Sequence, residues 1–400
     1  MWAAARPSRA SFGAWIVVKA IAVVDGEHYP PVVRDALAAL PYEFVGALLV
    51  GGTEKLRGGE GYGVPVVGSL DEVEADVVFD LSDEPVMPPA ERLRLASRAL
   101  VLGLGYIGAD FHFEPPRLAP FELPSLSVIG TGKRVGKTAV TSHVARLLAR
   151  EREVVVVAMG RGGPAEPELV ESPPTVEDLL ALSRTGRHAA SDHLEAAALA
   201  GVVTVGCRRA GGGLAGAVAH SNVAAGAELA RSLQPDVVVF DGSGAAIPPV
   251  ATSARILVTT AGHDLDAYLN PYRVAISDLV VGVGDVRGAD VSVGLRLRPI
   301  QPLAGRRTAV FTTGAAPVEH LDAELMHVSR NLANREALRA ELAGIDADVY
   351  LVELKAAAID VVAEAAAERG ADLVLAANDV VGDGLDDAVR SLLPQRVPAA

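Results

Sequence analysis

Cysteine is almost absent from this chain of 400 residues, which contains Cys207 and no other. A single thiol can form neither an intrachain disulfide nor a thiolate metal cluster, so neither of these can organise the fold. The expected role of Cys207 is therefore that of a small buried side chain.

Long apolar runs and net positive charge are also missing. No apolar stretch reaches the roughly 18 uninterrupted residues that a membrane-spanning helix requires, so we expect a cytoplasmic protein that binds no membrane. The formal net charge is −14, whereas a general nucleic-acid-binding protein normally has a basic surface. We therefore expect no nucleic-acid partner, and a local group of basic side chains has to hold any polyanionic ligand.

Aromatic residues make up only 4% of the chain, although hydrophobic residues make up 50%. Such a composition is typical of parallel sheets covered by helices. Strand-like runs alternate with helix-compatible stretches, which predicts an α/β fold with two doubly wound domains. Among the expected strands are residues 20–24, 45–50, 64–67, 77–80, 100–104, 154–159, 202–205, 256–260, 274–281, 308–312, 349–353 and 373–376.

The same pattern predicts the domain boundaries. Residues 19–116 are expected to form a small Rossmann-like α/β domain, and residues 117–124 a proline-stiffened linker. Residues 125–400 are expected to form a larger P-loop NTPase domain with a mostly parallel sheet, in which a C-terminal subdomain could begin near residue 305. The first 18 residues are interpreted as an extension that is not ordered or not native.

One glycine-rich run matches a dinucleotide-binding pattern but lacks the helix that such a site needs. Gly103, Gly105 and Gly108 match the dinucleotide pattern G-x-G-x-x-G and follow an expected strand. A nicotinamide site also needs a helix after this run, because the helix N-terminus binds the pyrophosphate. The next segment has no helical period and contains Pro115 and Pro116, so we reject a nicotinamide site here.

Lysine is scarce as well, with only five in the chain, but two of them fall in a second glycine-rich run. This run follows a short apolar strand and opens a helix-patterned segment at residues 139–150. Strand, glycine-rich turn and helix in this order are the context of a phosphate-binding loop, whose backbone amides surround a polyphosphate. The expected nucleotide-binding residues are Gly130, Thr131, Gly132, Lys133, Arg134, Val135, Gly136, Lys137 and Thr138.

Within this loop we assign Lys137 to the β- and γ-phosphates of ATP and the Thr138 hydroxyl to Mg²⁺. The strict pattern G-x-x-x-x-G-K-[ST] would place its first glycine at position 131, but Thr131 stands there and the glycine is Gly130. This spacing resembles that of the dethiobiotin-synthetase branch of P-loop enzymes. An N-K-x-D guanine-recognition motif is missing from the sequence, which favours ATP over GTP.

A second Mg²⁺ ligand is expected at Asp241, because it ends an apolar strand about one hundred residues after the loop. Basic residues also gather in polar or glycine-rich segments after the expected strands, where guanidinium groups suit phosphate. A single arginine in such a segment is more often an ordinary surface charge, and Lys355 could equally pair with Glu353. The substrate-binding candidates are Arg161, Arg187, His188, Arg208, Arg209 and Lys355, and the catalytic candidates are Lys137, Lys133 and Arg161.

Together with four further sequence blocks, these residues indicate a family. The blocks are VDGEHYPP at 24–31, AMGRGGP at 158–164, GCRR at 206–209 with the glycines that follow, and DGSGAAIPP at 241–249. From about Lys19 onward the chain resembles the cyclic 2,3-diphosphoglycerate synthetase family. The resemblance implies an ATP-dependent ligase that uses Mg²⁺ and acts on 2,3-diphosphoglycerate, and we expect a homodimer.

The reaction implied by this resemblance suits the residues. One phosphate of 2,3-diphosphoglycerate accepts the γ-phosphoryl group of ATP. The other phosphate then attacks intramolecularly, closes a cyclic pyrophosphate and expels inorganic phosphate. Repulsion between the phosphates is the main obstacle, and Mg²⁺, Lys133, Lys137 and the arginines would offset it.

Three other functions stay open at this stage. Another dethiobiotin-type ligase, with a carboxylate or carbamate substrate, would need fewer arginines near its site. A partitioning-type ATPase, which dimerises and binds partners, carries a lysine five residues before the loop lysine, where this chain has Gly132. A non-catalytic nucleotide-binding regulator would use the N-terminal domain as a sensor.

Overall fold

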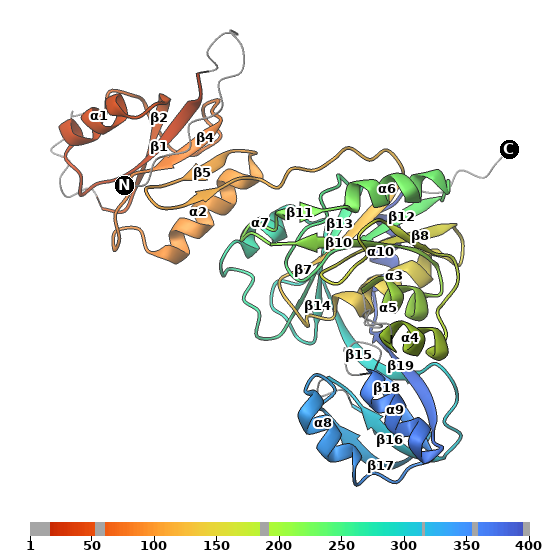
Figure 1. Cartoon of the computed structure of the whole chain (residues 1–400). Coiled ribbons are helices and arrows are strands. Elements are labelled where there is room, and N and C mark those ends of the chain that lie inside the picture. Colours follow the sequence, from red (N-terminus) through yellow and green to blue (C-terminus); the bar gives the residue numbers. More distant parts are fainter. Residues whose placement is uncertain (1–16, 53–60, 185–191, 314–316, 354–358, 395–400) are drawn as a thin grey trace. The chain divides into compact units, whose positions relative to one another are not determined.

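The computed structural model describes residues 17–52, 61–184, 192–313, 317–353 and 359–394 (Figure 1). Nearly all of the expected N-terminal extension lies outside these residues. The chain divides into two compact units, Met1–Pro115 and Pro116–Ala400. Across the described ranges, no helix combines the length and the apolar character needed to cross a membrane.

The N-terminal unit contains a six-stranded sheet in the order β3-β2-β1-β4-β5-β6. The first five of these strands pair in parallel, and β6 pairs antiparallel to β5. This order places the switch point of a Rossmann-like sheet between β1 and β4. The elements are β1 (Lys19–Asp25), α1 (Pro30–Ala39), β2 (Glu43–Val50), β3 (Val66–Val67), β4 (Val77–Asp80), α2 (Pro89–Val101), β5 (Gly105–Ile107) and β6 (His112–Phe113).

The strand expected at residues 100–104 is wrong, because α2 continues to Val101 and β5 begins only at Gly105. Leu95, Ala96, Ala99 and Leu100 are all buried, which is the spacing of one helical face. Gly103 then follows the helix in the left-handed region, with φ of 80°. The glycine-rich run at 103–108 thus contains β5, and strand β6 rather than a helix follows it.

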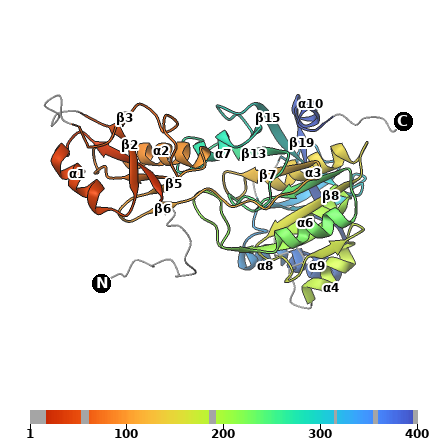
Figure 2. The same cartoon turned by 90° about the horizontal axis from the view of Figure 1, so that it is seen from above.

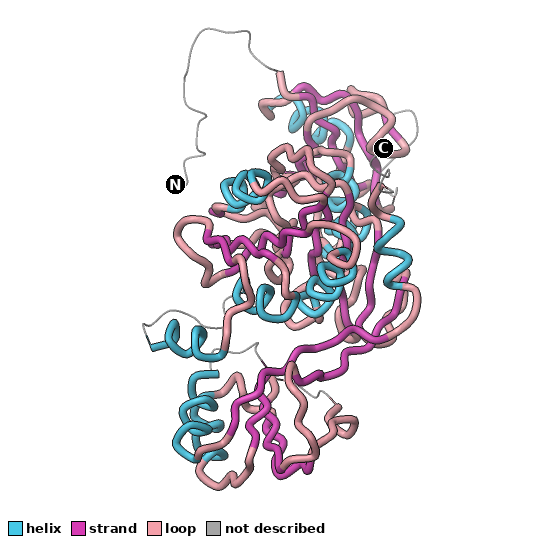
Figure 3. The backbone as a smooth tube through the Cα atoms, turned by 90° about the vertical axis from the view of Figure 1, so that its right-hand side faces the viewer, coloured by secondary structure: helices cyan, strands magenta, loops and turns pink. Residues whose placement is uncertain are grey.

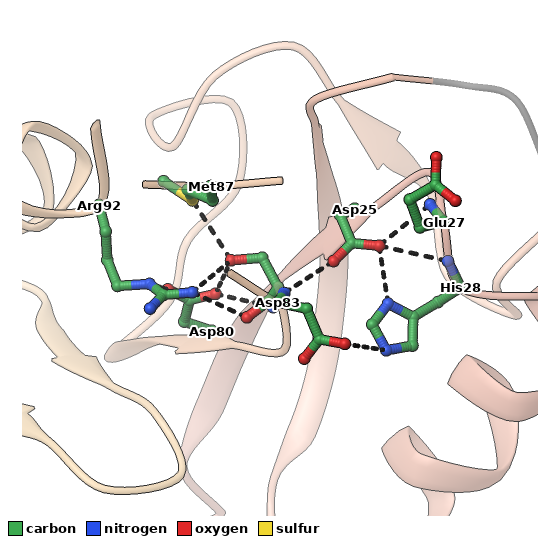
Figure 4. Close-up of polar contacts among 8 residues, drawn as sticks. Asp25, Glu27, His28, Asp80, Asp83, Met87 and Arg92 are labelled. Atoms are coloured by element: carbon green, nitrogen blue, oxygen red, sulfur yellow. Dashed lines mark hydrogen bonds and ion pairs between the residues drawn. The ribbon is translucent and has the colours of Figure 1, made fainter. Parts of the chain in front are cut away.

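A fully buried carboxylate ties together the loops at the carboxyl ends of β1 and β4 (Figure 4). Asp25 Oδ1 accepts hydrogen bonds from the amides of Glu27 and His28, and His28 Nδ1 lies 2.7 Å from the same oxygen. Asp25 Oδ2 accepts from the amide of Asp83 at 2.7 Å. The carboxylate thereby accepts hydrogen bonds from three backbone amides of the two loops.

These contacts predict a pH dependence of the N-terminal unit. Burial by itself would raise the pKa of Asp25, but the hydrogen bonds from Asp83 and His28 outweigh it, so the pKa lies below its usual value. Stability from such a group is present above the unfolded-state pKa of about 3.9 and is lost as the pH falls through the folded-state value. Asp25→Asn should therefore destabilise this unit at pH 7, and the loss of stability should be smaller at pH 3.

Urea unfolding at both pH values, followed by pulsed hydrogen exchange of β1 peptides, measures this effect. Asp35→Asn, on the exposed side of α1, is the matched control. An equal shift of the urea midpoint at both pH values would contradict the role given to Asp25.

The larger unit is built on a 13-stranded sheet in the order β11-β10-β8-β12-β7-β13-β14-β15-β19-β18-β16-β17, with β9 paired to β10. Its strands are β7 (Ser125–Gly130), β8 (Val154–Gly160), β9 (Glu168–Val170), β10 (Val203–Ala210), β11 (His220–Ser221), β12 (Val237–Asp241), β13 (Ala254–Thr260), β14 (Leu279–Val283), β15 (Val291–Pro299), β16 (Arg307–Phe311), β17 (Glu324–Ser329), β18 (Val349–Glu353) and β19 (Asp372–Val381). Its helices are α3 (Lys137–Leu148), α4 (Val176–Arg184), α5 (Asp192–Ala200), α6 (Val223–Ser232), α7 (Asn270–Ala275), α8 (Arg335–Leu342), α9 (Ile359–Arg369) and α10 (Leu385–Ser391). The expected α/β class with a mostly parallel sheet is confirmed.

Helices cover both faces of the P-loop part of this sheet (Figures 1 and 2). On one face, α3 and α5 pack against alternate strand residues such as Val128 and Val156. On the other face, α6 packs against Val157 and Phe240. Strands buried on both faces explain the nearly continuous valine runs in the sequence.

The proline-rich segment after Pro116 packs on this unit. The amide of Ala119 donates to Pro249 O at 2.9 Å, and Phe121 lies edge-on to Phe240 with ring centroids 5.2 Å apart. This segment is therefore held against the larger unit by backbone and aromatic contacts.

Two parts of the larger unit differ from expectation. Residues 274–281 were expected to form one strand, but they include the end of α7 and the beginning of β14. The pattern also did not predict β15 and β17, because only Val293 and Leu297 of β15 and Ser329 of β17 are buried. Partly exposed strands of this kind lack the apolar runs that revealed the central strands.

Strand β15 joins the P-loop part of the sheet to a C-terminal part whose strands run in the opposite direction. Residues 291–293 pair in parallel with the end of β14, and residues 294–299 pair antiparallel with β19. Strands β16, β18 and β19 are parallel to one another. Their carboxyl ends therefore point toward the carboxyl edge of the P-loop strands, and the long strands that join the two parts are visible in Figure 3.

Candidate nucleotide-binding site

The glycine-rich loop connects β7 to α3 at the carboxyl edge of the sheet. Gly136 caps α3 with φ of 87°, and a Cβ there would lie 2.8 Å from Val283 Cγ2, so only glycine fits. Arg134 also has a left-handed φ of 61°, which is a strained conformation for a residue with a side chain. Residues 132–138 line a cavity of about 370 Å³.

The displaced glycine has a structural reason. A Cβ at Gly130 would lie 3.0 Å from both Gly244 O and Val135 Cγ2, so close packing at the end of β7 favours glycine. Thr131 continues the strand: its amide donates to Val258 O at 3.1 Å, and its hydroxyl donates to Thr259 Oγ1 at 3.1 Å. Gly130 and Thr131 thus hold the start of the loop against the end of the sheet, and neither residue lines the cavity.

A buried ion pair lies at the base of the loop. Lys137 is 9% exposed and Asp241 is 1% exposed, and Lys137 Nζ donates to Asp241 Oδ1. The Thr141 hydroxyl donates to the same oxygen at 2.7 Å. Strand pairing aligns Asp241 with Val128 of β7, so the sheet register brings the lysine and the aspartate together.

The second oxygen of Asp241 fits a metal-binding role. Asp241 Oδ2 is buried and has no hydrogen-bond partner, which is costly for a carboxylate unless a ligand satisfies it. Thr138 lines the cavity next to Lys137. No group of three or more His, Cys, Asp or Glu side chains converges in the described ranges, so Mg²⁺ here would also need phosphate and water ligands, as it usually does.

Two arginines hold the loop after β12, whose residues Ser243 and Gly244 line the cavity. Arg209 Nη2 donates to Ser243 O at 2.9 Å. Arg273, which is 3% exposed, donates through Nε and Nη2 to Ala245 O at 3.1 and 2.9 Å. Sequence reasoning missed Arg273, because its helix α7 lies partly in a segment interpreted as a strand.

Arg273 predicts a stability effect. Its guanidinium also donates to Leu214 O at 2.9 Å and to Leu269 O at 3.2 Å, and burial lowers its pKa to about 10. Arg273→Ala would remove the side-chain donors to these carbonyls and open a cavity at a residue that is 3% exposed. We therefore expect a loss of about 2–4 kcal/mol in the free energy of unfolding. Urea unfolding measures it, with Arg287→Ala on an exposed loop as control; equal midpoints for the two variants would be a contrary result.

The predicted basic residues are only partly brought together. Arg161 follows β8 and lines the cavity. Arg208 and Arg209 were expected in a loop, but β10 continues to Ala210, because its end pairs with β11. Arg209 donates to Gly211 O and Ser243 O, and neither Arg208 nor Arg209 lines the cavity. The remaining candidates Arg187, His188 and Lys355 lie outside the described residues.

Besides Ser243 and Gly244, three further cavity-lining residues were not predicted as site residues. Glu195 of α5 is 5% exposed, and Thr313 and Ala333 come from the loops after β16 and β17. Each reaches the cavity through tertiary packing far from the loop in sequence, and no local motif marks any of them.

A strand, a glycine-rich turn and a helix above a buried Lys–Asp pair, on a mostly parallel sheet, define a P-loop nucleotide-binding protein. Family models for cyclic 2,3-diphosphoglycerate synthetase match in succession: the N-terminal domain at 19–114, the P-loop domain at 125–286 and the C-terminal domain at 299–379. The chain belongs to the cyclic 2,3-diphosphoglycerate synthetase family, which confirms the resemblance seen in the sequence.

Relatives with this name match along most of the chain. The cyclic 2,3-diphosphoglycerate synthetase of Rubrobacter xylanophilus is 44% identical, and the match covers 94% of this chain and 97% of the relative. That of Thermococcus gammatolerans is 41% identical, covering 93% and 96%. That of Methanothermus fervidus is 38% identical, covering 93% and 96%.

Proposed function

We propose that this protein uses ATP to convert 2,3-diphosphoglycerate into cyclic 2,3-diphosphoglycerate. The observation that carries the proposal is the buried Lys137–Asp241 pair beneath a cavity of about 370 Å³, in a chain that matches the synthetase family over all three of its domains. One substrate phosphate takes the γ-phosphoryl group, and ADP leaves. The other phosphate attacks the phosphorus that remains bound to the glycerate oxygen. Inorganic phosphate then leaves with the oxygen that had joined the two phosphorus atoms.

The loop residues supply binding and charge neutralisation in this reaction. Backbone amides of residues 132–138 surround the phosphates, and Lys137 turns from Asp241 to the γ-phosphate when the nucleotide binds. Lys133 is exposed and lines the cavity, where its ammonium offsets charge on the transferring group. No general base is needed, because a phosphate anion is already a nucleophile.

Asp241 Oδ2 and the Thr138 hydroxyl are the groups that would hold Mg²⁺. When bound, Mg²⁺ would supply positive charge that offsets the charge of the phosphates. Once Lys137 turns toward the γ-phosphate, the Asp241 carboxylate would lose its internal cation and could hold the metal.

Arg161 is the basic candidate best placed for the substrate, since it is exposed and lines the cavity. A charge-assisted hydrogen bond contributes about 1.5–3 kcal/mol. We therefore expect Arg161→Ala to raise the KM for 2,3-diphosphoglycerate roughly tenfold or more and to leave the KM for ATP nearly unchanged. Arg208→Ala, outside the cavity lining, should have a smaller effect; the reverse order of the two variants would refute this assignment.

The proposal is tested by ADP release from ATP and Mg²⁺ in the presence and absence of 2,3-diphosphoglycerate. Turnover should depend on the diphosphate, and 3-phosphoglycerate should not replace it, because it lacks the second phosphate. An equal rate of ADP release with and without 2,3-diphosphoglycerate would instead favour another ligase of the dethiobiotin type or a partitioning-type ATPase.

The proposal also includes a homodimer in the cytoplasm that does not bind nucleic acid. Sedimentation velocity tests the dimer, and gel-shift titration with duplex DNA tests nucleic-acid binding. The acidic net charge of −14 supports the latter expectation.

A further inference from the structure

The cavity has two walls that come from opposite parts of the sheet. One wall is the phosphate loop, and the other includes Thr313 after β16 and Ala333 after β17. Because β16, β18 and β19 run toward the P-loop strands, their carboxyl ends meet the cavity from the far side. Ligands of α/β sheets bind at carboxyl ends of strands, and here two such edges face one another.

A buried carboxylate holds the second wall in place. Glu353, at the end of β18, is 7% exposed. Its Oε2 accepts from the amide and the hydroxyl of Thr313 at 2.8 and 2.9 Å, and its Oε1 accepts from Asn378 Nδ2 at 2.6 Å. These three contacts connect the ends of β16, β18 and β19 and fix the position of Thr313.

The wall formed by Thr313 and Ala333 lies opposite the phosphate loop, on the side where the phosphoryl acceptor is expected. The phosphate loop binds the nucleotide from one side, so the γ-phosphate faces the opposite side of the cavity. Phosphoryl transfer is roughly in line, which places the accepting group beyond the γ-phosphate. We propose that the carboxyl edge of the C-terminal sheet is the binding wall for the phosphorylated acceptor, with Thr313 in contact with it and Glu353 as its positioning residue; this rests on the proposed function.

The hydrogen bonds of Thr313 suit this role. If its hydroxyl turns to donate to a phosphate oxygen of the acceptor, Glu353 Oε2 keeps the bond from the Thr313 amide and Oε1 keeps that from Asn378. The switch therefore leaves neither oxygen of the buried carboxylate without a donor. Arg161 lines the same cavity and supplies positive charge there.

The test compares Thr313→Val with Thr313→Ser in the full chain. Isothermal titration measures the binding of 2,3-diphosphoglycerate to protein saturated with a non-hydrolysable ATP analogue, and a fluorescent ATP analogue measures nucleotide binding. We expect Thr313→Val to weaken acceptor binding roughly tenfold to a hundredfold, the range for a hydrogen bond to a charged group. Thr313→Ser should restore most of it, and nucleotide affinity should be unchanged in both.

Glu353→Gln should raise the KM for 2,3-diphosphoglycerate with a smaller change in kcat. The glutamine has one hydrogen-bond-accepting oxygen fewer for Thr313 and Asn378, but its side chain has the same shape. Unchanged acceptor binding in Thr313→Val, or an equal loss of nucleotide binding, would overturn the inference. Failure of the proposed function looks different: the unaltered protein would then bind no 2,3-diphosphoglycerate, or would bind it without turnover.

Discussion

Lys137→Ala should lower kcat by at least about 10²–10³-fold, the loss seen when one preorganised charge-stabilising donor is removed from an active site. The lysine is the first residue of α3 and lies in the cavity lining, where its ammonium can leave Asp241 for the γ-phosphate. ADP release in the presence of 2,3-diphosphoglycerate measures the effect. Lys19→Ala, a partly exposed lysine of the N-terminal unit, serves as control.

The variant should also lose stability. Breaking a buried ion pair leaves the other charge uncompensated, which typically costs about 3–5 kcal/mol. The double variant Lys137→Met with Asp241→Asn removes both charges, so it should recover much of the stability and none of the activity. Recovery of both together would mean that the ion pair only supports the fold.

Asp241→Asn should be nearly as damaging to turnover, with a loss of about 10²-fold or more, because it neutralises the carboxylate that we assign to Mg²⁺. The amide still accepts the Thr141 hydrogen bond through its oxygen, so the local shape is kept. The separate readout is metal binding: electron paramagnetic resonance of Mn²⁺ with ATP should show at least roughly tenfold weaker binding of the metal.

Asp266→Asn, on an exposed loop of the same unit, is the matched control for that experiment. Unaltered Mn²⁺ affinity in Asp241→Asn would remove this residue from the metal site. It would also leave the unpartnered Oδ2 atom without a function.

The elements that local pattern predicted well are those buried on both faces. Strands β8 and β12 are nearly continuous apolar runs, and β7 is buried along its whole length. The glycine-rich turn between β7 and α3 has its own characteristic spacing. Asp241 could be singled out because a carboxylate ends such a run. Pairing with Lys137 then follows from strand register, which no local pattern contains.

The residues that sequence reasoning missed act through tertiary contacts. Arg273 binds carbonyl groups of two distant loops, and Glu353 fixes Thr313 across 40 positions of sequence. Short apolar segments caused the errors at residues 100–104 and 274–281, because such a run suits a buried helix end as well as a strand. Leu100 is buried together with Ala96, four residues earlier, which is the spacing of a helix and not of a strand.

Oxygen transfer from substrate to inorganic phosphate tests the central claim most directly. With ¹⁸O in the phosphate oxygens of 2,3-diphosphoglycerate, unlabelled ATP and ordinary water, the mechanism requires one ¹⁸O in each inorganic phosphate, since the leaving phosphate takes the oxygen that joined it to the substrate. Phosphorus NMR should show this isotope shift together with a new cyclic pyrophosphate signal. Unlabelled inorganic phosphate without a cyclic product would contradict the account, because it would show that water, and not the substrate, accepts the γ-phosphoryl group.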